Sequence, residues 1–232
     1  MTTILFPKLA VLSILAVLMA NVAEGAAQGG TGAATREVNL PQPPSAGAIS
    51  LEEALAQRRS VREFVPGALT LEIVSRLAWA AQGVTAPERR TTPSAGATYP
   101  LEVYVVAGNV DGLAAGVYRY RPYRHRLKAM AVGDLRVPLA AAVGQQWISN
   151  AAMVVVFTAE FERTTTRYSK RGERYVHMEA GHAAQNLLLQ AAALGLGATP
   201  VGAFNDAEIS RLLRLPAGET PLYIIPVGRV SR

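Results

Sequence analysis

The sequence predicts a single folded domain that combines helices with strands. Its 232 residues are 50% hydrophobic, which suits one sizeable core and does not suggest a second. The stretch 177–194 is rich in Ala, Leu, Gln and Asn and has no proline, which is the composition of a long helix. The run 151–158 is continuously apolar, as in a central strand, and 101–107 is a second strand.

The composition excludes some kinds of functional site and favours one class of ligand. The chain has no cysteine, so disulfides, Cys-ligated zinc and thiol nucleophiles are excluded. The formal net charge of +6 is compatible with nucleic acid, an anionic surface or a phosphate-bearing ligand. The arginines cluster beside motifs and form no long basic run, and no aromatic-basic platform is present. A phosphate-bearing ligand is therefore favoured, and nucleic acid is not expected.

The first 49 residues precede the predicted domain. In residues 1–27, Lys8 is followed by a short apolar run and then by small residues, which is typical of a signal peptide. This predicts an exported protein, periplasmic or secreted, without stable membrane insertion after cleavage; an uncleaved anchor is the alternative. Residues 28–49 mix Gly, Ala, Pro and polar residues and predict a flexible leader. The domain is expected over 50–232.

Caps mark the first two helices. Residues 50–53 form a capping box that begins a helix reaching about Arg59. A second helix is expected from Thr70 to Gly83. Between them lies a cluster that can surround a phosphate with charge-assisted hydrogen bonds, or that simply lies in water at a helix C-terminus: Arg58, Arg59, Ser60 and Arg62.

The middle of the chain alternates loops and strands. The Gly- and Pro-containing loop 89–100 leads into the strand 101–107 and is a favourable place for ligand contacts. A hairpin is expected from 117 to 130, with His125 exposed. A short helix over 134–143 precedes Gln145, and another helix begins at 205–208. The last strand, 222–227, is followed by Arg229, a candidate partner for a phosphate or carboxylate.

The helix at 177–194 has one face of small residues that leaves room for another backbone or a second copy of the helix: Ala180, Gly181, Ala183 and Ala184. Gly195 and Gly197 are expected to supply positive φ angles at its end, before the extended strip 199–204. No metal site is predicted, because His177 and His182 lie at i and i+5 and do not share a helix face. The charged segment 160–175 is either a solvated face or a substrate-facing surface.

In their order and spacing, six motifs resemble the FMN-dependent nitroreductase superfamily, and within it the SagB-type dehydrogenases, which include the azoline oxidases of ribosomal peptide biosynthesis. The resemblance runs from about residue 50 to the C-terminus. The motifs are RRSVR (58–62), PSAGATYPLEVYVV (93–106), GVYRY (116–120), RYSKRGERY (167–175), EAGHAAQNLLLQAAALGLGATPVGAF (179–204) and PVGR (226–229).

The resemblance implies an α+β fold with a nitroreductase-like central antiparallel sheet flanked by helices, in an intertwined homodimer that holds two FMN molecules at its interface. It assigns the FMN phosphate and ribityl chain to Arg58, Arg59, Ser60 and Arg62. It assigns contacts with the partner chain's flavin to Pro93, Ser94, Ala95 and Gly96. The flavin N5 and O4 edge is assigned to Pro200, Val201, Gly202 and Ala203, with Gln145 at the ring edge. Arg229 or Arg232 is expected at the phosphate.

The implied activity is an FMN-dependent oxidoreductase that moves a hydride between NAD(P)H or an organic donor and a small-molecule or peptide acceptor. Such transfer strictly requires no acid, base or nucleophile from the protein, and the sequence contains no triad. Azoline oxidases carry a Lys-Tyr pair as a proposed base, where this chain has Arg167-Tyr168. Because arginine stays protonated, Tyr168 is left as a candidate proton donor or substrate contact. A flavin-binding, non-catalytic protein and an azoline oxidase remain alternatives.

Overall fold

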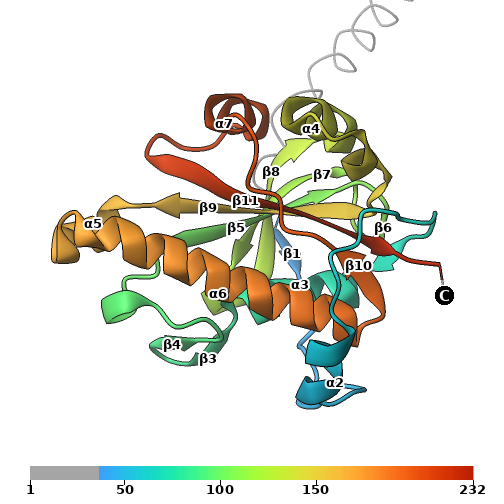
Figure 1. Cartoon of the computed structure of the whole chain (residues 1–232), viewed down its shortest axis with the longest axis horizontal. Helices are drawn as coiled ribbons and strands as arrows, with labels where there is room; N and C mark the ends of the chain where they lie inside the picture. The colour runs from blue at the N-terminus through green and yellow to red at the C-terminus, as the bar shows by residue number, and fades with distance from the viewer. Residues whose placement is uncertain (1–36, 232) are drawn as a thin grey trace, which may run out of the picture. The chain divides into compact units, whose positions relative to one another are not determined.

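A seven-stranded sheet is the centre of the fold. The computed structural model of the protein describes residues 37–231. The strand order is β1 (Glu37–Asn39), β8 (Arg126–Val132), β7 (Gly116–Arg121), β5 (Leu101–Ala107), β9 (Met153–Glu160), β11 (Glu219–Arg229) and β10 (Leu196–Ala198). Every neighbouring pair is antiparallel. The predicted α+β class, a central antiparallel sheet flanked by helices, is confirmed (Figure 1).

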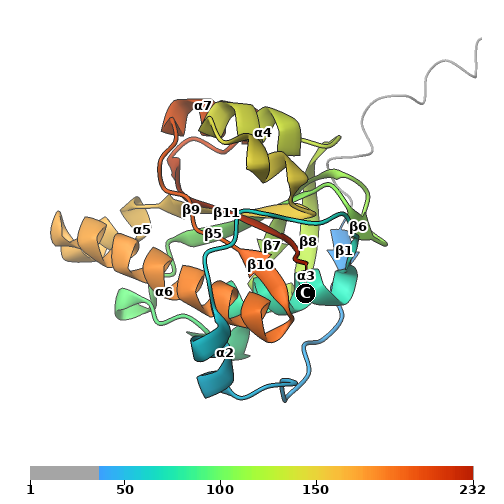
Figure 2. The same cartoon turned by 45° about the vertical axis from the view of Figure 1, so that its right-hand side comes forward.

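Helices cover both faces of this sheet. Helices α4 (Arg136–Val143) and α7 (Asp206–Leu213) lie on one face, and α3 (Leu71–Gln82) and α6 (Arg171–Ala193) lie on the other, as both views show (Figures 1 and 2). Successive residues of a strand point to opposite faces. Val103 and Val105 accordingly join the core under α3 and α6, while Tyr104 and Val106 join the core under α4 and α7. Strands covered on both sides explain the apolar runs in the sequence.

The smaller elements connect these layers. They are α2 (Leu51–Gln57), β2 (Leu69–Thr70), β3 (Val84–Ala86), β4 (Arg89–Arg90), η2 (Ala95–Ala97), β6 (Val110–Asp111), η3 (Pro122–Arg124), η4 (Gln146–Asn150) and α5 (Glu162–Tyr168). The predicted capping box at Ser50 and cap at Thr70 are confirmed, and Asn205 caps α7; each of these side chains accepts a backbone hydrogen bond. Among residues 37–231, no helix combines the length and apolar character needed to cross a membrane.

The central helix differs from its prediction in two respects. It begins at Arg171, so the charged segment before it is already helical, and its 23 residues span about 35 Å. The small-residue face does not provide a contact for a second copy, because Ala180, Ala183 and Ala184 are buried within this chain. On that face Gly181 alone is partly exposed, and a Cβ there would meet nothing within 4 Å.

The two glycines after α6 have different roles. Gly195 has the expected positive φ of 67° and ends the helix. The prediction of a positive φ is wrong for Gly197, which lies in β10. A Cβ at Gly197 would come within 2.8 Å of the Val61 side chain, so this glycine permits close approach of the segment that follows α2.

The N-terminal part of the described chain corrects the prediction of a flexible leader. Residues 37–39 form β1, which pairs with β8, and Leu40 is buried. His125, expected to be exposed, is only 9% exposed. Its Nε2 lies 2.7 Å from the Ser75 Oγ and 2.9 Å from the Pro41 carbonyl oxygen, and its Nδ1 lies 2.8 Å from the Tyr120 Oη. The ring thus fastens the leader to the core. The predicted signal peptide lies outside the described residues.

Candidate functional site

A cleft of about 620 Å³ opens where α2 ends, beside the C-terminal half of α6 and the ends of β10 and β11. Arg58, Arg59 and Arg229, three of the predicted phosphate ligands, line it together with Glu63. None of these three arginines forms an ion pair with a carboxylate of residues 37–231. The cleft therefore has a surplus of positive charge that is available to an anion.

The arginines are placed by backbone pairing. Ser60 forms a parallel bridge with Ala198, and the Val61 N–H donates to the Ala198 carbonyl at 3.1 Å. The Arg59 guanidinium donates to the carbonyls of Ala56 and Arg58, at 2.7 and 2.9 Å. Arg229 donates from Nε to the Ala68 carbonyl at 3.0 Å. The segment after α2 is thus fixed to the edge of the sheet, where Arg58 and Arg59 line the cleft.

The predicted strip at 200–203 continues from the same edge. Val201 is buried and exchanges two backbone hydrogen bonds with Ile224 of β11, at 2.8 and 3.0 Å. Gly202 and Ala203 are exposed, and within residues 37–231 their N–H groups donate to no other backbone or side-chain acceptor. Two free N–H groups beyond a fixed residue are suited to binding an electron-rich edge of a ligand.

Several residues predicted for this part of the site lie outside the cleft lining: Ser60, Arg62, Gln145, Pro200, Val201, Gly202 and Ala203. Arg62 is exposed and is not among the lining residues. Gln145 precedes η4, whose Trp147 ring lies 6.2 Å from the Phe64 ring of the segment after α2. Gln145, two residues before Trp147, therefore lies near the segment that follows α2. Pro200 is half-buried. It follows Thr199, whose hydroxyl donates a hydrogen bond to the Val61 carbonyl at 2.6 Å.

The loop 93–99 forms the second part of the predicted site, away from the cleft. Gly96, Ala97 and Tyr99 all have left-handed φ angles, of 60°, 54° and 46°. Such angles are uncommon for residues other than glycine and persist where neighbouring structure enforces them. Ser94 accepts a hydrogen bond from the Tyr99 N–H at 2.9 Å, which closes the loop.

Helix α5 holds the same loop from outside. The Arg167 guanidinium donates to the Gly96 carbonyl at 3.1 Å, and Arg163 donates to the Tyr99 carbonyl, also at 3.1 Å. A Cβ added at Gly96 would lie 2.6 Å from the Tyr168 Oη. The candidate proton donor Tyr168 is thus beside the predicted flavin-contacting loop, with its ring edge-to-face against Tyr175.

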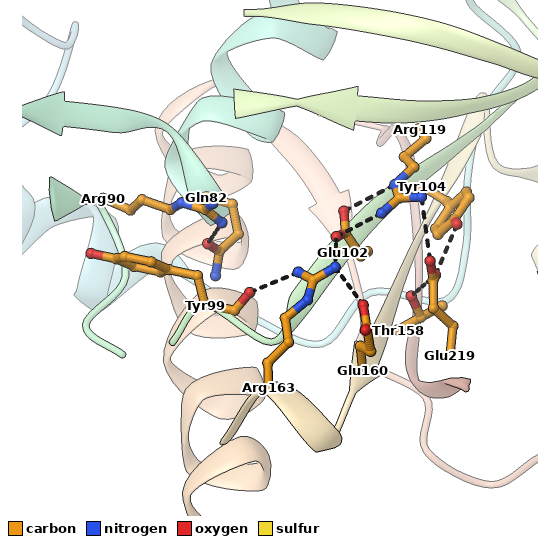
Figure 3. Close-up of polar contacts among 10 residues, drawn as sticks. All are labelled: Gln82, Arg90, Tyr99, Glu102, Tyr104, Arg119, Thr158, Glu160, Arg163 and Glu219. Atoms are coloured by element: carbon orange, nitrogen blue, oxygen red, sulfur yellow. Dashed lines mark hydrogen bonds and ion pairs between the residues drawn. The ribbon is translucent and has the colours of Figure 1, made fainter. Parts of the chain in front are cut away.

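A buried polar chain of Glu179, Gln82 and Arg90 lies under the loop, and no functional role was predicted for it. Glu179 of α6 is 3% exposed, and its Oε1 accepts a hydrogen bond of 3.5 Å from the Gln82 amide. Arg90 donates to the Gln82 Oε1 at 3.0 Å and stacks over the Tyr99 ring, 4.2 Å from its centroid (Figure 3). Burial raises the pKa of Glu179 to about 7, against the lowering effects of the Gln82 hydrogen bond and of the Arg90 charge.

A second polar network ties the neighbouring strands together. Arg119 of β7 lies between two carboxylates, 2.7 Å from Glu102 and 3.4 Å from Glu219 (Figure 3). Glu219 also accepts hydrogen bonds from the buried hydroxyls of Tyr104 and Thr158, both at 2.8 Å. Glu102 extends the network to Arg163 of α5 at 2.9 Å. The network therefore fixes the helix that supports the loop.

Within one chain the two parts of the predicted site are well separated. Glu179 contacts the loop part, and Ala192 lines the arginine cleft, both on α6. The axial rise between these positions is about 20 Å. The described residues also hold no group of three or more His, Asp or Glu side chains placed to bind a metal ion.

The fold and cleft define an α+β protein with a cationic ligand site at the edge of its sheet. The chain matches the model of the nitroreductase family over residues 55–229. It is 48% identical over 198 residues to a nitroreductase-family protein of Methanocaldococcus jannaschii, covering 84% of this chain and 97% of that one. A solved nitroreductase-family structure from Ralstonia eutropha superposes with a TM-score of 0.75 at 32% identity, over 88% of this chain and 93% of that one.

The chain belongs to the nitroreductase family. It is also 29% identical, over 133 residues, to the microcin B17-processing protein McbC of Escherichia coli, which covers 55% of this chain and 49% of that protein. Members of the family are oxidoreductases that typically bind FMN and are usually dimers.

Proposed function

We propose that this protein is an FMN-dependent oxidoreductase that moves a hydride between an organic donor or NAD(P)H and an acceptor. The observation that carries the proposal is the cleft, where Arg58, Arg59 and Arg229 have no carboxylate partner among the described residues. Its volume of about 620 Å³ falls within the range of about 300–1,000 Å³ typical of cofactor and ligand sites. The donor set suits a phosphate, so the residues fit FMN.

Each part of the chain would contribute a separate function. The guanidiniums of Arg58, Arg59 and Arg229 would hold the phosphate with charge-assisted hydrogen bonds. The free N–H groups of Gly202 and Ala203 would stabilise negative charge at the ring edge. When bound, FMN supplies the hydride-accepting and hydride-donating chemistry itself. Tyr168 would deliver a proton to the acceptor.

The proposal includes a homodimer whose sites combine residues from both chains. The support is the separation of about 20 Å between the loop part and the cleft part along α6. One chain cannot place both parts on the same small ligand, whereas a second copy can bring its loop 93–96 to the first copy's cleft. Mixing two inactive variants, one altered in the cleft and one in the loop, should restore activity in part of the mixed dimers.

The test of the cofactor uses purified protein incubated with FMN and then gel-filtered. The wild-type protein should retain flavin absorbance, and Arg58→Ala combined with Arg59→Ala should lose it. Each lost charge-assisted bond costs about 1.5–3 kcal/mol, so FMN affinity should fall at least about 100-fold. The matched control is Arg121→Ala with Arg211→Ala, two exposed arginines outside the cleft. Protein that stays colourless with FMN would refute the proposal.

The electron donor is tested by anaerobic stopped-flow with NADH, NADPH and a panel of acceptors. Reduction of the bound flavin identifies an enzyme. Flavin that no donor reduces identifies the alternative, a flavin-binding protein without catalysis.

A second candidate function, in the SagB-type subfamily, is azoline oxidation on modified peptides. It is favoured by the likeness to a microcin-processing protein. A hollow of about 530 Å³ is lined by Lys170, Arg171, Glu173, Arg174 and His177, and its three basic side chains would suit an acidic peptide. Against it stands Arg167, which donates to the Gly96 carbonyl and cannot serve as a base. Conversion of an azoline peptide to the azole, detected by a mass loss of two hydrogens, tests this candidate.

We also propose that the protein is exported through residues 1–27. Mass spectrometry of the N-terminus of the protein isolated from periplasm or medium tests export and cleavage together. Intact residues 1–27 on a membrane-bound protein would identify the anchor alternative.

A further inference from the structure

A second pocket, of about 340 Å³, lies between β4 and the turn that joins β7 to β8. It shares no lining residue with the arginine cleft. Its volume is at the lower end of the range of about 300–1,000 Å³ that small-molecule sites occupy. Most of its lining side chains are cationic or aromatic, and Glu102 is the one carboxylate among them; the others are Arg90, Tyr120, Arg121, Pro122, Tyr123 and Arg124.

Arg90 brings a half-buried positive charge that has no counterion. Its Nη1 donates to the Gln82 Oε1 at 3.0 Å (Figure 3), and no ion pair involves it within residues 37–231. Its buried Nε has no hydrogen-bond partner in the same part of the chain. Gln82 is neutral and satisfies only one of the several donors of the guanidinium. A bound oxyanion would therefore supply both the negative charge and the acceptors that this site lacks.

Two tyrosine rings flank the Arg90 guanidinium. Its central carbon lies 4.2 Å from the Tyr99 ring centroid and 5.4 Å from the Tyr123 ring centroid. These contacts orient the guanidinium without neutralising its charge. Tyr120 lines the pocket with its ring, because its hydroxyl is engaged 2.8 Å from the His125 Nδ1. Tyr123 is 66% exposed, so its ring is available to stack on a planar ligand.

The one carboxylate of the pocket does not cancel this charge. Glu102 lies 2.7 Å from Arg119 and 2.9 Å from Arg163, so two cations outside the lining already compensate it. Arg124 has a 70% exposed side chain, and its ion pair with Glu37 is long, at 3.9 Å. The pocket therefore keeps a surplus of positive charge, which favours an anionic ligand.

We propose that this pocket binds a small aromatic oxyanion, which is a carboxylate or a phosphate ester carried on a single ring. The oxyanion accepts hydrogen bonds from the Arg90 guanidinium, and the ring stacks against Tyr123. Arg124 adds electrostatic attraction at the rim. This site goes beyond the proposed function and does not depend on bound FMN. Because Tyr99 belongs to the loop 93–99, the ligand lies close to that loop.

The experiment measures the Kd for benzoate and for phenyl phosphate by isothermal titration calorimetry at constant ionic strength. The wild type should bind at least one of these anions, and the one that binds more tightly identifies the oxyanion. Benzamide, the neutral analogue of benzoate, should bind at least about tenfold more weakly. Arg90→Gln should weaken binding of the anion at least about tenfold, because charge-assisted hydrogen bonds are lost. Tyr123→Ala should weaken it about three- to tenfold through loss of the ring contact.

The arginine cleft also attracts anions, so a cleft variant separates the two sites. Arg58→Ala combined with Arg59→Ala should keep a site with the wild-type affinity for the aromatic anion, even though FMN retention is lost. Failure of the proposed function and failure of this inference are therefore distinguishable. Arg211→Gln, which removes an exposed charge on α7, is the matched control and should bind the anion as the wild type does.

Tyr123→Ala combined with Arg124→Gln carries the test if Arg90→Gln does not fold, because both of these side chains are exposed. Three outcomes would overturn the inference. They are absence of binding of both anions, equal affinity for benzamide, and anion binding that the cleft variant abolishes while the pocket variants keep it.

Discussion

Removing the Glu219 side chain should destabilise the protein more than any single surface change. Glu219 is 8% exposed and accepts from Tyr104 and Thr158, both 0% exposed, while Arg119 lies 3.4 Å away. Glu219→Ala leaves the two hydroxyls without this acceptor, at about 1–3 kcal/mol each. It also breaks a largely buried ion pair, at about 3–5 kcal/mol. Because neighbouring terms are not additive, we expect a total loss of about 4–6 kcal/mol.

Loss of this size is a large fraction of the about 5–15 kcal/mol that stabilises a typical protein. Glu219→Gln keeps an acceptor for both hydroxyls and should cost about 1.5–3 kcal/mol, the value of a hydrogen bond to a charged group. Urea unfolding, followed by the fluorescence of Trp79 and Trp147, gives the free energy of unfolding of the wild type, Glu219→Ala and Glu219→Gln. The control is Glu37→Ala, which removes half-exposed ion pairs with Arg126 and Arg124 near the surface and should cost about 1 kcal/mol.

The reasoning fails if Glu219→Ala loses no more stability than Glu37→Ala. A double-mutant cycle with Tyr104→Phe separates the hydrogen bond from the rest of the network and should give a coupling energy of about 0.5–3 kcal/mol. Burial beside the Glu219 carboxylate raises the pKa of Tyr104, which keeps this hydroxyl a donor throughout the usable pH range.

Three further outcomes follow from the loop and the leader. Gly96→Ala should lower FMN affinity at least tenfold, because a Cβ there meets the Tyr168 Oη at 2.6 Å; Gly112→Ala, with a similar φ of 76° and open space, should cost only the backbone strain of about 1–2 kcal/mol. Tyr168→Phe should reduce kcat about 100-fold or more at unchanged FMN affinity, and an unchanged kcat removes Tyr168 from catalysis. His125→Asn should remove the share of the pH dependence that comes from this ring, so the stability advantage of the wild type over the variant should shrink as the pH falls from 6.5 to 5, measured by thermal unfolding.

Local patterns were sufficient to predict the elements, because each is determined by residues close in sequence. The capping box at Ser50 and the caps at Thr70 and Asn205 were predictable within a few residues. Strand β9 was predictable because both of its faces are buried, which demands an apolar run. The clustering of Arg58 and Arg59 was visible in sequence, whereas their meeting with Arg229 depends on sheet pairing across the whole chain.

The buried polar groups were not predictable in the same way. Glu102, Arg119 and Glu219 are far apart in sequence, and only the antiparallel register brings their side chains together. The sequence indicated no role for Glu179. Its place on α6 next to Ala180 and three residues after Val176, both buried, would have indicated an inward-facing carboxyl. His125 was taken as exposed because arginines flank it, but its left-handed backbone turns the ring inward.

Glu179 and His125 give the stability of the flavin-free protein opposite dependences on pH. The folded pKa of Glu179 is raised from 4.5 to about 7, so its stabilising contribution is complete below pH 4.5 and is lost as the pH rises through 7. Burial lowers the folded pKa of His125 below 6.5, so its contribution is present above pH 6.5 and is lost as the pH falls. Between pH 5 and pH 7 the two effects oppose each other. The wild-type protein should therefore vary less in stability than either Glu179→Gln or His125→Asn, whose slopes should have opposite signs.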